Sequence, residues 1–359
     1  NSEFGDPELK PELTTSVEFG TQLSFLDSRL DLDVTYYKSN AEDQIIPVPI
    51  SDGTGFSSYI TNAGEIENSG FEVVLSGDII KKSDFQWTAT ANLSMNNNEI
   101  KSIREGIDEI VIGSQFGYAG STVTMKLIKG DAYGNLYGTS YERFGADENA
   151  VSLNSGLPTV IGDNGFPLTN SNQLILGNAV PKWIGGLRNM FSYKNLELSF
   201  LVDFRADVEQ YNQFDNFLSA FGKNEYTLTR NDFKVFDGVL ADGSPNTQEV
   251  WLGQGVGPDG VDYGAGFWRN YYRGVSENFV QDASYVKLRN ISLAYTFGDR
   301  VLDRIPFKSM RVSLAANNII LYSPWDGFDP ESFSAGAGGN AVGFTGLGFP
   351  GTQSYFLTF

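Results

Sequence analysis

Apolar and polar residues alternate along much of this chain, beginning with the segment TTSVEFGTQLSFL. There Val17, Phe19 and Leu23 alternate with polar residues or glycine, as in a β-strand, whose successive side chains point to opposite faces. The next segment, LDLDVTYY at residues 30–37, repeats the pattern, and only the turn DSR lies between the two. Two alternating segments joined by a tight turn predict a β-hairpin.

The same alternation predicts three further hairpins and a terminal strand. FEVVLSGDII and FQWTATANLSMN flank the turn KKSD, and KWIGGLRNMFSYK and LELSFLVDF meet at Lys194 and Asn195. YVKLRNISLAYTFG and MRVSLAANNIILY lie on either side of residues 298–309, and QSYFLTF ends the chain. With shorter candidates near 136–144 and 235–252, this gives about ten strands, most of them near the roughly 9–11 residues with which a tilted strand crosses a bilayer.

The connections between these strands alternate between tight and long. The turns named above are tight, whereas the connections near residues 43–62, 103–181, 205–284 and 323–351 are long and rich in glycine and aromatic residues. Short turns at one edge and long loops at the other are typical of an outer-membrane barrel, with periplasmic turns and extracellular loops. The pattern therefore predicts an all-β fold, an antiparallel transmembrane β-barrel. Hairpins of a soluble β-sandwich or propeller are the alternative.

The last strand continues to the final residue of the chain. Chain ends are usually frayed and polar, so an alternating apolar strand at this place is expected to be hydrogen-bonded to its end and paired with the first strand of a closed barrel. It also resembles the insertion signal that the barrel-assembly machinery reads in outer-membrane proteins. The matching positions are Tyr355, Leu357 and Phe359.

Aromatic residues near the ends of the predicted strands suggest where a membrane would end. Outer-membrane barrels place Trp and Tyr at the two interfaces between lipid and water. The candidates for these interfacial aromatics, in contact with outer-membrane lipid, are Tyr36, Trp87, Trp183 and Tyr193. Polar residues on the opposite faces of the strands would line the lumen; they include Asp31, Asp33, Glu197, Asp203 and Arg311.

The amino-acid composition excludes several classes of binding and catalytic site. The 40 Gly, 27 Phe and 17 Tyr favour strands and turns. A formal net charge of -19, from 25 Lys and Arg against 44 Asp and Glu, excludes a general nucleic-acid binder, which needs a basic face. The absence of Cys and His excludes disulfides, zinc-thiolate sites and Ser-His-Asp triads. Glycoside cleavage by two carboxylates stays open.

Several segments together resemble one transporter family. GDPELKPELTTSVEFG, RLDLDVTYYKSNAEDQI, NAGEIENSGFEV and FQWTATANLSMNNNEI come first, and LGNAVPKWIGGLRNMFSYKNLELSFLVDFR and SYVKLRNISLAYTF follow in the family's order. The chain is similar to the C-terminal part of a SusC/RagA-type TonB-dependent transporter. The similarity covers nearly the whole chain, residues 1–359, outside its long loops.

The resemblance implies much that the residues alone do not. It implies a barrel of about 22 strands around an N-terminal plug, in the outer membrane of a Gram-negative bacterium. It further implies a SusD-like surface lipoprotein as a lid, energy from TonB, ExbB and ExbD, and import of oligosaccharides or peptides without enzymatic activity. No plug and no TonB box can be found in this chain, so we expect it to be one part of the transporter.

The stretch GFWRNYYRG is the first candidate site for a substrate or partner. Trp268, Tyr271 and Tyr272 are interleaved there with Arg269 and Arg273. Aromatic rings stack on sugars or peptide side chains, and arginine donates to carboxylates. The other interpretation is that these residues only pack the loop against the barrel mouth.

The stretch SPWDGFDPESF is the second candidate. Trp325 and Asp326 could contact a substrate or partner, and the acidic residues of this stretch could hold a structural Ca²⁺ through oxygen ligands. Their spacing matches no defined calcium loop, so solvated turn carboxylates are the alternative. We expect no cofactor, and the sequence leaves the presence of a metal unknown.

Two other functions stay open at this point. The first is a secreted β-rich protein that binds glycans, or a glycoside hydrolase with paired carboxylates. The second is a passive porin, which differs from an importer in having no plug.

Overall fold

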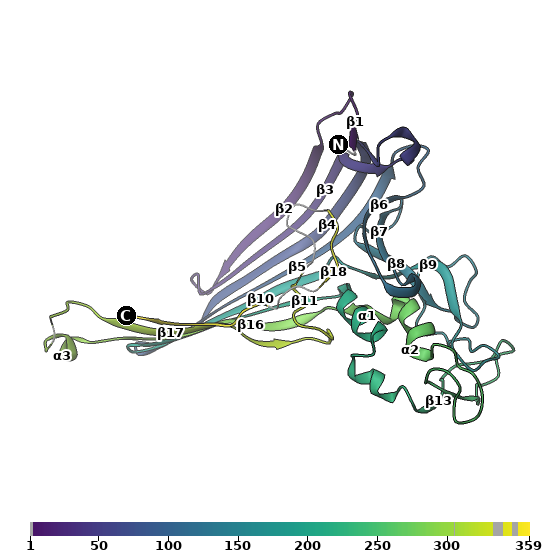
Figure 1. The fold of residues 1–359 in the computed structure, drawn as a ribbon. Coiled ribbons are helices and arrows are strands. Elements are labelled where there is room, and N and C mark those ends of the chain that lie inside the picture. The colour runs from purple at the N-terminus through teal and green to yellow at the C-terminus, as the bar shows by residue number, and fades with distance from the viewer. Residues whose placement is uncertain (1–2, 305, 333–339, 347–350) are drawn as a thin grey trace.

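The computed structural model describes residues 3–304, 306–332, 340–346 and 351–359. A ten-stranded sheet, strongly twisted and curved in Figure 1, dominates it. Its order is β19-β17-β16-β11-β10-β5-β4-β3-β2, and β1 pairs with β4. The strands are β1 (Glu3–Gly5), β2 (Leu13–Phe25), β3 (Leu30–Pro49), β4 (Ser58–Lys81), β5 (Phe85–Ile103), β10 (Trp183–Tyr193), β11 (Leu196–Ala206), β16 (Tyr285–Thr296), β17 (Arg311–Tyr322) and β19 (Ser354–Thr358).

The four predicted hairpins are confirmed. Strand β2 pairs with β3, β4 with β5, β10 with β11 and β16 with β17, all antiparallel. Turn residues Asp27, Ser28 and Lys194 adopt positive φ angles of 56°, 60° and 52°, the left-handed conformation that tight turns require and that Asp and Asn tolerate best. The short α3 (Asp299–Leu302) lies in the β16–β17 connection.

One face of the sheet is apolar across all its long strands. In the ladder, Phe19 lies opposite Tyr36, which lies opposite Phe71. A second row follows the register from β4 to β19 through Ile80, Trp87, Phe191, Leu198, Leu293, Leu314 and Leu357. Because side chains alternate between faces, the polar residues of the same strands share the other face.

The long connections lie together at one end of the sheet and the short turns at the other (Figure 1). The connection predicted near 43–62 is much shorter than expected, because β3 continues to Pro49 and β4 begins at Ser58. Only residues 50–57, with the 3₁₀ turn η1 (Asp52–Thr54), join the two. The sequence pattern loses its strict alternation there because the register shifts between Ala41 and Ile45.

The strand candidates near 136–144 and 235–252 are not part of the large sheet. They contribute to small sheets in the loops: β6 (Ile110–Gln115), β7 (Val123–Leu127), β8 (Asn135–Tyr141) and β9 (Thr169–Asn178) in one, and β13 (Phe233–Val235) and β14 (Glu249–Trp251) in another. A third contains β12 (Glu209–Asn212), β15 (Val280–Asp282) and β18 (Phe344–Thr345). Short segments of this kind resemble the strands of the ten-stranded sheet, called the wall below, in composition. They pair locally, within the connections.

Helices are short and lie in the connections. Besides α3 and η1, they are α1 (Gln213–Ala220) and α2 (Phe267–Asn270), with the 3₁₀ turns η2 (Tyr118–Gly120), η3 (Glu225–Thr229), η4 (Tyr272–Gly274) and η5 (Ser276–Asn278). Within the described ranges, no helix is long and apolar enough to cross a membrane. The long connections pack around a hydrophobic cluster of their own, called the loop core below, which contains fully buried side chains such as Met125, Tyr211 and Phe279.

The terminal strand is hydrogen-bonded to β17, but among the described residues it does not pair with β1 or β2. Strand β19 pairs with β17 from Asn317 opposite Ser354 to Ser313 opposite Thr358. Among the described residues, β19 has no second partner strand and β2 pairs only with β3. Within the described residues the sheet is therefore an open section of a barrel wall, and the pairing of the last strand with the first strand of the closed barrel stays a prediction.

Candidate functional site at the loop end of the sheet

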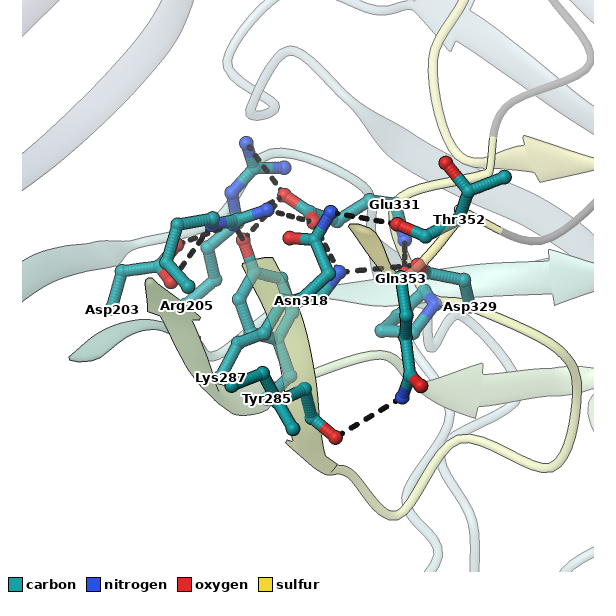
Figure 2. A network of polar contacts seen from close by, with 12 residues as sticks. Asp203, Arg205, Tyr285, Lys287, Asn318, Asp329, Glu331, Thr352 and Gln353 are labelled. Carbon is teal, nitrogen blue, oxygen red and sulfur yellow. Dashed lines mark hydrogen bonds and ion pairs between the residues drawn. The ribbon is translucent and has the colours of Figure 1, made fainter. Parts of the chain in front are cut away.

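A buried lysine begins the site on the polar face of the sheet. Lys287, on β16, is 4% exposed, and its Nζ lies 3.1 Å from Asp329 Oδ2 and 2.8 Å from Glu331 Oε2. Both carboxylates come from the connection between β17 and β19 (Figure 2). The ion pairs therefore attach this connection to the wall.

Arg289 extends the network to the neighbouring strand. Its Nε and one terminal nitrogen lie 3.1 and 2.5 Å from the two carboxylate oxygens of Asp203 on β11, and its other terminal nitrogen lies 2.7 Å from Glu331 Oε2. Tyr285 donates to Glu331 Oε1 at 2.8 Å. Such two-pronged arginine–carboxylate contacts fix orientation as well as charge.

A β-bulge explains how two cations come to share one face. The register shifts at Arg289 in both ladders, so that Leu288 and Asn290 have partners in β11 and β17 while Arg289 lies between them. One additional residue in a strand turns the following side chains to the other face. The bulge therefore keeps Lys287, Arg289 and Asn290 on the polar side.

Electrostatics make the carboxylate of Glu331 the centre of this network. Burial raises its pKa, but hydrogen bonds from Arg289, Lys287 and Tyr285 outweigh burial and lower the pKa to about 2. A charged pair removed from water is stable only if it is fully hydrogen-bonded, and removal of one partner leaves an uncompensated charge. Asp329 and Glu331 are thus engaged by cations of the wall.

The second predicted stretch supplies two carboxylates of this network, Asp329 and Glu331, and the rest of it packs nearby. Trp325 is 8% exposed and lies in a small core with Val208 and Ala283. The backbone oxygen of Asp326 accepts a hydrogen bond from Asn212. Among the described residues, no three acidic side chains gather into a group that could hold a metal ion.

A buried carboxylate that the sequence analysis missed lies nearby on α1. Asp215 is 5% exposed and accepts hydrogen bonds from Tyr226 at 2.8 Å, from Gln281 at 3.2 Å and from Asn224. Burial raises the pKa of Asp215 to about 6, the Tyr226 hydrogen bond opposes that shift, and the charge of Asp326 adds to it. This carboxyl group therefore keeps its proton to a higher pH than an ordinary aspartate does.

The aromatic residues of the first predicted stretch pack against one another and against the loop core. The rings of Tyr271 and Phe166 stack with centroids 4.3 Å apart, and Tyr272 lies 4.9 Å from Trp268 and 5.4 Å from Phe279. For Tyr271 and Tyr272 the packing interpretation is thus the one that the contacts favour. Trp268 also faces a pocket.

That pocket brings both predicted arginines together with residues distant in sequence. Arg269 and Arg273 line it with Trp268, and so do Arg230 and Trp251. The cavity has a volume of about 420 Å³. No pattern in the sequence linked Arg230 or Trp251 to the stretch GFWRNYYRG, because the loop fold alone joins them.

The four predicted interfacial aromatics lie on the apolar face of the sheet. Tyr36 is in ladder register with Phe71, and Trp183 with Met95 in the same row; Trp87 and Tyr193 lie near the short-turn end. Tyr355 lies opposite Ala316 and Leu357 opposite Leu314, and Phe359 is 83% exposed. Their roles at the lipid interface and in barrel assembly stay predictions.

Comparison with known proteins gives a consistent picture. Residues 1–319 match the family model described as "TonB dependent receptor-like, beta-barrel". TonB-dependent receptor P3 of Formosa agariphila is 26% identical over 344 residues, which cover 92% of this chain and 32% of that protein. TonB-dependent receptor SusC of Bacteroides thetaiotaomicron is 26% identical over 330 residues, covering 90% of this chain and 30% of that protein.

Solved structures show the same fold. The RagAB peptide importer in the "closed-closed" state has a TM-score of 0.66 at 21% identity, over 98% of this chain and 35% of the other. The structure of the RagAB peptide transporter has a TM-score of 0.65, also at 21% identity, over 96% of this chain and 35% of the other. The chain thus spans about a third of the length of the proteins that it matches.

Proposed function

Because the chain belongs to the TonB-dependent receptor-like β-barrel family, we propose that it forms the C-terminal wall and loops of an importer for oligosaccharides or peptides. The family is located in the outer membrane of Gram-negative bacteria and consists of transporters, not enzymes. The alternative of a secreted glycoside hydrolase is therefore wrong. That the whole transporter imports oligosaccharides or peptides, and which partners it works with, is part of the proposal.

The division of the sheet into two unlike faces is the observation that carries this proposal. The apolar rows leave large side chains such as Leu187 and Leu293 42% exposed, and in water so wide an apolar surface would be covered by a second layer. The opposite face holds the ion-pair network of Lys287 and Arg289. Apolar residues toward lipid and polar residues toward a lumen are the arrangement of a membrane barrel.

We further propose that a SusD-like lipoprotein covers the loop end and that TonB, ExbB and ExbD supply the energy. The supporting observations are the sequence similarity to SusC and the structural similarity to RagAB. The TonB force would act on a plug in another part of the full transporter. Assembly would depend on the barrel-assembly machinery, with the terminal strand as its signal.

Uptake measurements in the host bacterium test the function. Labelled oligosaccharide and peptide mixtures are supplied to wild-type cells, to cells without the full transporter gene and to cells without TonB. We expect one mixture to accumulate in wild-type cells only. Uptake that needs the transporter but persists without TonB would indicate a passive porin and contradict the proposal.

A further inference from the structure

The pocket that contains Arg269 and Arg273 has walls from four separate loop segments. They are η2, the stretch from the end of α1 to residue 231, the stretch 251–254 that begins with the last residue of β14, and α2 with η4. The side chains that matter for its chemistry are Tyr118, Arg230, Trp251, Trp268, Arg269 and Arg273. A cavity of about 420 Å³ is within the range of small-molecule sites and holds a group of one or two residues, not a protein surface.

Three cations share this pocket without a carboxylate. No Asp or Glu among the described residues lies within 4.0 Å of the guanidinium group of Arg230, Arg269 or Arg273. Burial, and after it the charge of Arg269, lowers the pKa of Arg273 below its ordinary value. In a chain of net charge -19, this concentration of unpaired positive charge is a local exception, and a bound anion would relieve the repulsion.

The pocket also offers hydrogen-bond donors. Arg273 Nε and Trp268 Nε1 are buried and have no hydrogen-bond partner among the described residues. A buried donor without an acceptor costs free energy, so an acceptor group from a ligand would be favoured here. Tyr118 and the two tryptophans provide flat apolar walls, and the guanidinium of Arg273 lies 5.7 Å from the centre of the Tyr118 ring.

We propose that this pocket binds the carboxylate of the imported ligand, between Arg230, Arg269 and Arg273, with an adjoining ring or side chain against the tryptophans. The proposal rests on the import function proposed above and names a feature of its substrate. Arginine binds carboxylates in a planar, two-pronged geometry. The C-terminus of a peptide and a uronic acid of an oligosaccharide carry the same group, so either source satisfies the site.

Matched acidic and neutral probes test the proposal on the full-length transporter purified in detergent. Calorimetry compares trialanine with trialanine amide, and trigalacturonate with its methyl ester. The variants are Arg230→Gln and Arg269→Gln, both at exposed positions. Arg300→Gln, on α3 at the opposite end of the sheet, is the control.

We expect one acidic probe to bind at least about tenfold more tightly than its neutral partner. Each pocket variant should remove most of that difference, and the control should keep it. The better acidic probe identifies the source as peptide or uronate. Failure of both acidic probes to bind, equal affinity for acidic and neutral probes, or unchanged affinity in both variants would overturn the proposal. TonB-dependent uptake that persists alongside such a result would leave the import function standing.

Discussion

The wall and the loop region of this molecule are held together in different ways. In the wall, regular ladders join the strands, while large apolar side chains such as Phe71 and Leu314 stay 49% and 57% exposed. In the loops, the ladders are short, but Val123, Met125, Tyr211 and Phe279 are fully buried. In the proposed membrane barrel, lipid would be the partner of the apolar face of the wall, whereas the loops contain a close-packed core of their own.

This difference separates the tasks of the two regions. A ladder of main-chain hydrogen bonds tolerates many side chains as long as each face keeps its polarity. A packed core depends on the volume of each side chain. We therefore expect sensitivity to truncation to concentrate in the loops and sensitivity to charge to concentrate in the wall.

The largest effect is expected from truncation of the loop core. Phe279→Ala removes a fully buried ring that contacts Tyr272 and should destabilise the loop region by about 3–5 kcal/mol. Proteolysis of the loops on intact cells measures this as faster cleavage. Phe71→Ala, at a 49% exposed wall position, is the matched control and should leave loop cleavage unchanged. Equal effects of both changes would contradict the comparison.

The next effect is expected where the two regions meet. Lys287→Met leaves Asp329 and Glu331 without their lysine and should cost about 3 kcal/mol, because buried carboxylates lose a partner. Lys81→Met removes an ion pair of similar length, because Lys81 Nζ lies 3.1 Å from Asp78 Oδ2. The Lys81 side chain is 60% exposed, so the loss in free energy of unfolding should stay below about 1 kcal/mol. Thermal unfolding in detergent compares the two. A larger loss in Lys81→Met would contradict the role of the network.

A smaller, pH-dependent effect is expected from Asp215. Its pKa of about 6 in the folded loops lies above the ordinary value of 3.8, so the folded state holds the proton more tightly than the unfolded state. Stability should therefore fall as pH rises from about 4 to about 6, by at most about 3 kcal/mol. Asp215→Asn should flatten the dependence of the unfolding temperature on pH in this window. An unchanged slope in that variant would refute the assignment.

Glu331 should make stability depend on pH in the opposite direction, and at lower pH than Asp215 does. Its folded pKa of about 2 lies below the ordinary 4.5, so its contribution is present above about pH 4.5 and is lost as pH falls toward 2. Glu331→Gln should remove that acid-sensitive part while the Asp215 effect remains. The two pH windows thus distinguish the loop carboxylate from the one that joins loop and wall.

How far the sequence predicts the structure also differs between the two regions. Alternation predicts the hairpins of the wall because strand period and face polarity are local properties. It misses the bulge at Arg289, since the shift depends on both neighbouring strands. In the loops, the aromatic stretch near Trp268 is visible in the sequence, but Arg230, Trp251 and the buried Asp215 are not. Contacts between residues far apart in the chain bring them together, and no local pattern encodes these contacts.

Cysteine labelling along β11 tests most directly whether the apolar face meets lipid. The chain contains no cysteine, so each introduced residue gives its own signal against the same background. Phe200→Cys and Val202→Cys lie on the apolar face, and Ser199→Cys and Leu201→Cys on the polar face, judged by their ladder partners. In native outer membranes, a water-soluble maleimide should label positions 199 and 201 and leave 200 and 202 protected. Labelling of 200 and 202 with protection of 199 and 201 would contradict the membrane-wall account.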